Sequence, residues 1–175
     1  MNMRESRLEA EENKINEFVK IYQGISIIEK RGFPPEFYRF EFNVKGYLDA
    51  NGTISDKHTV LLEFPKEYPF VPPRVSLEKR VFHPNIYATG DICYGYNPLQ
   101  WHEKKLFADI MAADLLFDLT NMIRLSDKTI NLQSIASENY IFWTDWLKKF
   151  THPLQDEIKK AKTSSKVKII RVINE

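Results

Sequence analysis

The chain has 175 residues, of which 25 are basic, 24 are acidic and one is a cysteine. This length suits one domain, or one domain with a tail, and the balanced charge argues against a nucleic-acid or membrane-surface partner. One cysteine cannot form an internal disulfide, residues 1–14 are mostly charged and polar, and no apolar run reaches the length of a membrane span. We therefore predict no signal peptide and no membrane span, and we expect the protein in the cytoplasm.

The first predicted element is an amphipathic helix over residues 3–22. Its apolar side chains, among them Leu8, Ile15 and Phe18, recur at helical spacing, and charged residues cover the rest of its surface. A first strand is predicted to begin within residues 25–28.

A second strand is predicted over residues 38–48, because apolar and polar side chains alternate along it. The side chains that face the core under this pattern are Tyr38, Phe40, Phe42, Val44 and Leu48. Asn51-Gly52 is a turn signal, after which residues 58–64 predict the returning strand and residues 74–77 a further strand. Consecutive strands of this kind predict one antiparallel sheet.

The second half of the chain is predicted to be a long loop followed by helices. Residues 65–101 are rich in proline and lack periodicity, and such segments inside a compact domain are usually functional. A largely buried helix is predicted over residues 104–124 and another over residues 132–150. The predicted domain covers residues 1–162, with a tail over residues 163–175. Because strands and helices are segregated along the chain, the predicted class is α+β.

The most specific pattern in the chain lies between residues 68 and 101. Its fixed points are Tyr68-Pro69-Phe70, Pro72-Pro73, His83-Pro84-Asn85-Ile86, Gly90, Ile92-Cys93 and Trp101. In identity and spacing these residues resemble the active-site segment of the ubiquitin-conjugating enzymes, and the match needs no insertion or deletion. The resemblance implies the ubiquitin-conjugating fold, in which an N-terminal helix, an antiparallel meander, a cysteine-bearing loop and C-terminal helices follow in this order.

The resemblance also implies an enzyme. Such an enzyme takes a ubiquitin-like modifier from an activating enzyme and transfers it to a lysine of a protein substrate, directly or through a ligase. Cys93 is the first candidate for catalysis, because an exposed thiol can carry an acyl group as a thioester and so split one difficult transfer into two easier steps. A lone cysteine is more often a buried, inert residue, but the loop and its flanking motif favour the catalytic interpretation here.

The tripeptide before the cysteine supplies the next candidates. The resemblance assigns Asn85 to support of the active-site loop and to stabilisation of the oxyanion that forms when an amine attacks, a role that suits an amide donor. A purely structural brace for a turn is the alternative. By the same resemblance His83 holds the loop through hydrogen bonds rather than acting as a base, Pro84 sets a rigid turn, and Trp101 packs over the loop.

Three further residues are candidates for contacts with partner proteins. The resemblance assigns Phe70 to the surface that meets ligases, and Arg4 and Arg7 to the helix that meets the activating enzyme. The alternatives are simple packing for Phe70 and a solvated charged face for the two arginines.

The chain also departs from the family. Tyr94-Gly95 follows the cysteine where many relatives carry an acid at the second position, and His102-Glu103-Lys104 stands where Ser-Pro-Ala is usual. We therefore expect an atypical member, for which recognition of an ordinary RING-type ligase is in doubt. One pathway in which such a member is expected is a bacterial conjugation system that acts in antiviral defence. Asp127 lies near the position of a loop acid that orients the attacking lysine in the family, and a solvated loop acid is the alternative.

Two other functions stay open. One is a non-catalytic module of the same fold that binds ubiquitin-like proteins or peptides, although such variants typically lack the cysteine. The other is a cysteine hydrolase in which Cys93 is paired with His83, His102 or His152, although none of these histidines lies in a hydrolase motif.

No metal or cofactor is expected. Three acids, Asp109, Asp114 and Asp118, are spaced as the polar strip of the predicted helix and have no accompanying histidine or loop of oxygen ligands. The chain has no phosphate-binding glycine loop, so we expect that any ATP is consumed by a partner.

Overall fold

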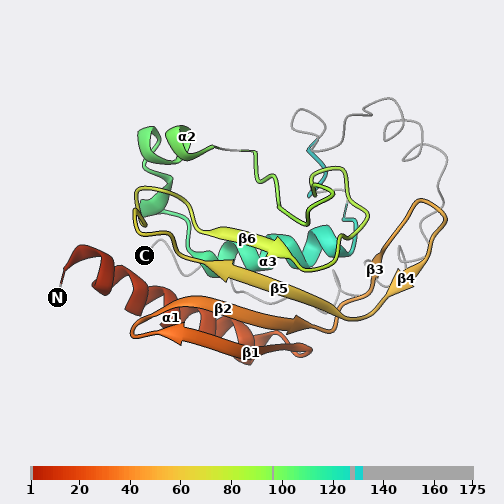
Figure 1. The fold of residues 1–175 in the computed structure, drawn as a ribbon, viewed down its shortest axis with the longest axis horizontal. Coiled ribbons are helices and arrows are strands. Elements are labelled where there is room, and N and C mark those ends of the chain that lie inside the picture. The colour runs from red at the N-terminus through yellow and green to blue at the C-terminus, as the bar shows by residue number, and fades with distance from the viewer. Residues whose placement is uncertain (1, 96, 127–128, 132–175) are drawn as a thin grey trace, which may run out of the picture. The chain divides into compact units, whose positions relative to one another are not determined.

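The computed structural model describes residues 2–95, 97–126 and 129–131, all of which fall in one compact unit (Figure 1). The predicted N-terminal helix is confirmed as α1, Met3–Ile21. It begins with a capping box, in which Asn2 Oδ1 accepts from the Glu5 backbone N–H at 2.9 Å and Glu5 Oε2 accepts from the Asn2 N–H at 3.0 Å. This arrangement satisfies two donors that a helix start otherwise leaves unpaired.

The predicted antiparallel meander is confirmed as a four-stranded sheet with the order β1-β2-β5-β6. Its strands are β1 Ile25–Gly32, β2 Pro35–Phe42, β5 His58–Glu63 and β6 Arg74–Leu77. A separate pair, β3 Gly46–Tyr47 and β4 Ile54–Ser55, flanks the predicted turn at Asn51-Gly52.

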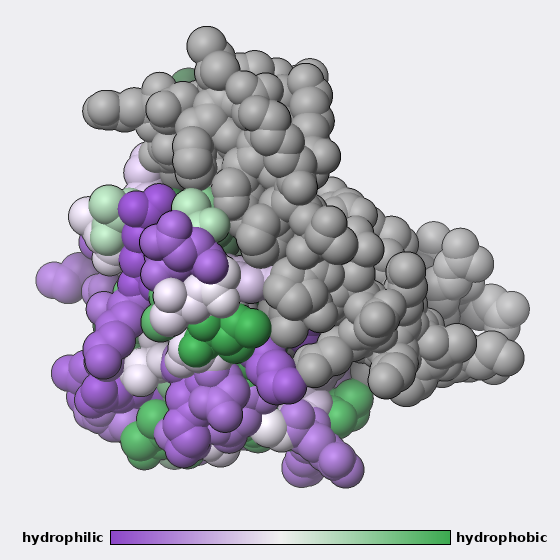
Figure 2. Space-filling model, turned by 90° about the vertical axis from the view of Figure 1, so that its right-hand side faces the viewer, coloured by the Kyte–Doolittle hydropathy of each residue, from purple (hydrophilic) through white to green (hydrophobic). Residues whose placement is uncertain are grey.

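The core lies between one face of this sheet and two helices, α1 and α3 Ala112–Ile123. Figure 1 shows both helices behind the sheet. The inward side chains alternate along β2 as predicted, and those of β5 alternate in the same way. They are Tyr38, Phe40, Phe42, Val60 and Leu62. Burial of such apolar and aromatic surface is the main favourable contribution to folding. The face in Figure 2 is mainly hydrophilic where it belongs to described residues, with separate hydrophobic patches.

The predicted inward position of Leu48 is wrong. The strand over residues 38–48 stops at Phe42, and beyond it Tyr47 is fully buried whereas Leu48 is 38% exposed. The reason is a close approach at Gly46, where a Cβ atom would lie 2.6 Å from the Ile123 carbonyl oxygen. The chain passes against the end of α3 at this point, and the alternation changes phase.

The predicted helix over residues 104–124 is too long at its start. The structure has a short helix α2, Pro98–Glu103, which was not predicted, then a 3₁₀ turn η1, Leu106–Ala108, and only then α3. Lys105 takes a left-handed conformation with φ of 51°, which interrupts the helical path. At the start of α3, Asp114 Oδ2 accepts from the Met111 N–H and Glu11 Oε2 accepts from the Ala112 N–H, each at 2.8 Å, so the cap is partly local and partly distant.

Several predictions fall on residues that the structure does not describe. They are the helix over residues 132–150, the domain boundary between residues 162 and 163, and the tail. Within the described ranges, no helix is both long and apolar enough to cross a membrane.

Candidate active site

The segment from Asn85 to Cys93 is a tight hairpin. Ile86 pairs with Ile92 in an antiparallel bridge, and the Cys93 N–H donates to the Asn85 carbonyl at 2.9 Å. Ile86 is fully buried and Ile92 packs against the core. Because side chains alternate along a strand, the residues on either side of these two isoleucines face the opposite way. Asn85 and Cys93 therefore share the face of the hairpin that is turned away from the core.

The turn of this hairpin is closed by Tyr87 to Asp91. The Tyr87 N–H donates to the Asp91 carbonyl at 2.9 Å, and the Thr89 hydroxyl donates to the Asp91 carboxylate at 2.7 Å. Gly90 has φ of +90°, and a Cβ atom there would lie only 2.0 Å from the Leu77 carbonyl oxygen. Only a glycine therefore lets the turn lie directly on β6.

Tyr87 is a site residue that the sequence prediction missed. It shares the outward face with Cys93, because Tyr87 lies two residues from Asn85 on the same strand of the hairpin. The charge of Cys93 raises the pKa of Tyr87, with further contributions from burial and the charge of Asp91. Tyr87 is 43% exposed and Cys93 is partly exposed, so the pair is open to solvent. The alternation of the two isoleucines on either side of the turn was the signal that could have identified it.

His83 lies beneath the hairpin. It is fully buried, its Nδ1 accepts from the Asn85 backbone N–H at 3.0 Å, and its Nε2 is 3.4 Å from the Thr129 hydroxyl oxygen. Burial lowers the pKa of His83 to about 3. The imidazole is thus neutral at physiological pH and lies between the Asn85 backbone N–H and the Thr129 hydroxyl. Pro84, which follows it, is also buried.

Asn85 is paired on both sides of its amide. Its Nδ2 donates to the Asn131 carbonyl at 2.8 Å, and its Oδ1 accepts from the Asn131 N–H at 2.9 Å. The side chain is 1% exposed. This double contact fixes the plane of the amide and ties the hairpin to the segment 129–131. An amide nitrogen carries two N–H groups, so the pairing is compatible with a second donated bond.

Trp101 contacts the proline-rich corner at residues 68–70. It is fully buried in α2, and its Nε1 donates to the Pro69 carbonyl at 2.7 Å. The neighbouring Phe70 is 42% exposed and contacts the rings of His102 and Phe107, with ring centroids 5.9 Å and 5.5 Å away. The described hydrogen bond of Trp101 therefore joins it to the corner that carries Phe70.

Arg4 and Arg7 both make contacts within the chain. Arg4 pairs with Glu36 at 2.7 Å, and Arg7 contacts Glu11 and the Tyr68 hydroxyl, each at 3.0 Å. The two side chains are 24% and 19% exposed. They consequently hold α1 to the rest of the domain, whatever else they contact.

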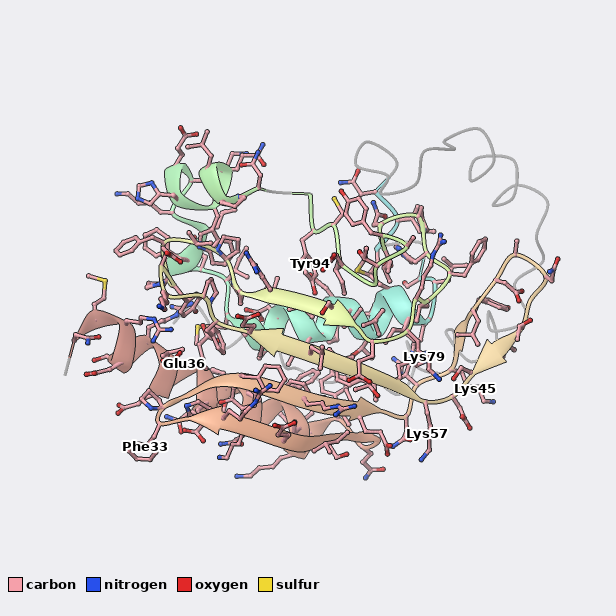
Figure 3. The ribbon with its side chains drawn as sticks, in the orientation of Figure 1. Phe33, Glu36, Lys45, Lys57, Lys79 and Tyr94 are labelled. Atoms are coloured by element: carbon pink, nitrogen blue, oxygen red, sulfur yellow. The ribbon has the colours of Figure 1, made fainter. Side chains whose placement is uncertain are left out.

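The remaining sequence features are Tyr94, Asp127, His152 and the question of a metal site. Tyr94, one of the departures from the family pattern, points from its loop toward α3, where its hydroxyl donates to the Leu115 carbonyl at 3.1 Å (Figure 3). Asp127 and His152 lie outside the described residues. In the described part of the chain, no group of three or more histidine, cysteine or acidic side chains is arranged to hold a metal ion.

The chain is similar to known proteins in sequence and in fold. The family model for ubiquitin-conjugating enzymes matches residues 34–138, which is more than half of the chain. A protein named ubiquitin-conjugating enzyme E2 2, from Kluyveromyces lactis, is 48% identical over 42 residues, or 24% of this chain and 26% of that protein. The alignment thus spans about a quarter of that relative's length.

Two solved structures are similar in fold. The crystal structure of ubiquitin conjugating enzyme E2 UbcA1 from Agrocybe aegerita has a TM-score of 0.51 at 20% identity, and covers 70% of this chain and 83% of its own. The structure of S. cerevisiae Ubc12 has a TM-score of 0.56 at 16% identity, and covers 82% of this chain and 72% of its own. At these sequence identities, the similarity to the two structures shows a shared fold.

Proposed function

Because the chain belongs to the ubiquitin-conjugating enzyme family, we propose that it accepts a ubiquitin-like modifier from an activating enzyme as a thioester on Cys93. It then transfers the modifier to a lysine amine of a protein substrate. The observation that carries this proposal is the partly exposed Cys93 on the outward face of a hairpin whose other face is buried. A nucleophile that must meet two large partners in turn needs both access and a fixed backbone.

The rigid surroundings of the thiol support a division of roles. His83 accepts from the Asn85 backbone N–H, and the Asn85 side chain forms two hydrogen bonds to the segment 129–131. In the transfer step, the attacking amine converts the thioester carbonyl to an oxyanion, and we propose that the Asn85 amide stabilises this charge. We assign Asp127 to the orientation of the incoming lysine, as the resemblance implies.

Partner contacts follow the same proposal. The exposed Phe70, with His102 and Phe107 against it, is assigned to a ligase surface in the reactions that use a ligase. Helix α1 is assigned to the activating enzyme, with Arg4 and Arg7 shaping its surface through their pairs with Glu36 and Glu11. ATP is consumed by the activating enzyme.

The buried histidine argues against a hydrolase. A cysteine hydrolase needs an imidazole that can take a proton from the thiol. His83 has a pKa lowered to about 3 and has its Nδ1 occupied by the Asn85 N–H, and His102 lies against Phe70. Neither His83 nor His102 therefore suits a general base beside Cys93.

The test is the chemistry of the adduct in cells that naturally make the chain. Tagged protein is recovered under acidic, non-reducing conditions and weighed intact. We expect wild type to carry an adduct that a thiol reductant releases, Cys93→Ser to carry one that the reductant leaves in place, and Cys93→Ala to carry none. A Cys93→Ala protein with the wild-type adduct would contradict the proposal.

A further inference from the structure

Tyr94 occupies an inward position directly after the thiol. Ile92 and Tyr94 both pack against the hydrophobic core, and Cys93 lies between them. Because side chains alternate along extended backbone, these two neighbours anchor one side of the chain while the thiol projects from the other. The isoleucine side chain has no hydrogen-bonding group, whereas the Tyr94 hydroxyl donates to the Leu115 carbonyl in α3 at 3.1 Å (Figure 3). The residue after the thiol is therefore joined to α3 by a directional bond.

The thiol is held from its other side by the tripeptide. The Cys93 N–H donates to the Asn85 carbonyl at 2.9 Å, and the Asn85 amide pairs with the backbone of Asn131 at 2.8 Å and 2.9 Å. Asn131 follows α3 along the chain, and between them the Ser126 N–H donates to the Asn121 carbonyl of α3 at 3.0 Å. Both tethers of Cys93 consequently lead to α3 or to the segment that follows it.

The chain turns immediately after Tyr94. Gly95 has φ of +84°, a conformation that favours glycine, and a Cβ atom there would lie 3.2 Å from Nδ2 of Asn131. The loop after the thiol thus returns against the same residue that pairs with Asn85. The backbone that carries Cys93 is in this way bounded on three sides.

We propose that Tyr94 is a positioning residue, whose hydrogen bond to α3 holds the Cys93 loop so that a thioester on the sulfur lies against the Asn85 amide during transfer to lysine. This inference rests on the proposed function and deepens it by naming a residue that acts through the backbone of Cys93. It concerns the geometry of the transfer step and assigns no proton transfer to the phenol.

The transfer step shows why the position of the sulfur matters. The lysine nitrogen attacks the thioester carbonyl carbon, and the oxyanion that forms then collapses. A carbon–nitrogen bond forms, the carbon–sulfur bond to Cys93 breaks, the sulfur leaves as a thiolate, and the extra proton of the amine passes to solvent. An amide donor stabilises the oxyanion only at hydrogen-bond distance, so a displaced Cys93 loses part of the contribution of Asn85.

One hydroxyl group can be removed to test this tether. Tyr94→Phe keeps the ring against the core and removes only the hydrogen bond to α3. Tyr22→Phe is the matched control, because Tyr22 also packs against the core and its ring centroid lies 5.8 Å from that of Phe117 on α3. Circular dichroism and thermal unfolding establish that both variants are folded.

The first readout is hydrogen exchange of single backbone amides, measured by NMR. The Cys93 N–H reports on the loop, and the Leu77 N–H, which donates to the Gly90 carbonyl at 2.9 Å, is the reference on β6. We expect the Cys93 amide to exchange about 2-fold to 10-fold faster in Tyr94→Phe than in wild type, with the Leu77 amide unchanged and Tyr22→Phe like wild type at both. An unchanged Cys93 amide, or equal acceleration at both amides, would overturn the inference.

The second readout is transfer itself. Tagged proteins loaded in the cells that naturally make the chain are purified, and the loss of their adduct to free lysine is followed by intact mass at a series of lysine concentrations. We expect Tyr94→Phe to discharge about 2-fold to 10-fold more slowly, by the same factor at every concentration, which places the effect on the step and not on lysine binding. Tyr22→Phe should discharge like wild type.

The two readouts separate the possible failures. A faster Cys93 amide in Tyr94→Phe, together with an unchanged rate of discharge, would overturn the positioning role although the tether exists. A wild-type protein that carries no adduct would contradict the proposed function, and this inference with it. The amide measurement uses no modifier, so it reports on the tether alone.

Discussion

Lowering the pH from 7 to 5 should destabilise this protein chiefly through His83. The imidazole is fully buried, and burial lowers its pKa to about 3. In the unfolded chain a histidine has a pKa of about 6.5. At a pH between these two pKa values, the unfolded state binds a proton on this histidine and the folded state does not. The stabilisation is therefore complete above about pH 6.5 and is lost progressively as the pH falls toward 3.

The size of this loss follows from the two pKa values. One pH unit across the window between them is worth about 1.4 kcal/mol. From pH 7 to pH 5 the protein should lose about 2 kcal/mol of unfolding free energy through this one group. Burial also lowers the pKa of His58, which adds a loss of the same sign, and it raises the pKa of Glu11, which acts in the opposite direction.

A matched variant isolates the contribution of His83. In His83→Asn, the side-chain oxygen can replace Nδ1 as the acceptor for the Asn85 N–H. Urea unfolding, followed by tryptophan fluorescence at pH 7, 6 and 5, gives the unfolding free energies of both proteins. We expect wild type to lose about 2 kcal/mol more than His83→Asn over this range. Parallel pH dependence in the two proteins would refute the assignment of a buried, neutral imidazole.

Three further substitutions have defined outcomes. Asn85→Ala should spare thioester formation but slow discharge to free lysine about 100-fold in single-turnover assays, since one oxyanion donor contributes ~3 kcal/mol; a folded variant that cannot be loaded would contradict this role. Glu11→Ala removes the acceptor of the Tyr68 hydroxyl and the external cap of α3, and should lower the unfolding free energy in urea by at least about 3 kcal/mol. Gly90→Ala should lower the unfolding free energy by more than about 1 kcal/mol, because the added Cβ atom would meet the Leu77 carbonyl oxygen. An unchanged urea unfolding midpoint in Glu11→Ala or in Gly90→Ala would contradict the prediction for that variant.

The parts of the fold that depend on local pattern were predicted from the sequence. The strand at residues 74–77 was predicted with its observed bounds, and α1 differs from its prediction by one residue at the C-terminal end. In both, the spacing of apolar side chains matches the period of the element and nothing distant overrides it. The match of residues 68–101 to the family motif likewise needed only identity and spacing.

The parts that depend on contacts distant in sequence were not predicted. The inward position of Leu48 failed because Gly46 meets Ile123 at the end of α3. At the misplaced start of α3, the Ala112 N–H is paired with Glu11, 101 residues earlier. No local pattern contains such contacts, whereas the missed Tyr87 was recoverable from the alternation around its turn.

The carrier role of Cys93 can be measured directly with a Cys93→Lys variant. A lysine at this position should trap a transferred modifier as an isopeptide that no reductant releases. The tagged variant is expressed in cells that naturally make the chain, beside Cys93→Ala, and both are weighed intact. We expect an added mass of the size of a ubiquitin-like protein on Cys93→Lys and none on Cys93→Ala. An unmodified Cys93→Lys protein, in cells where the conjugation pathway is active, would contradict the proposed carrier role.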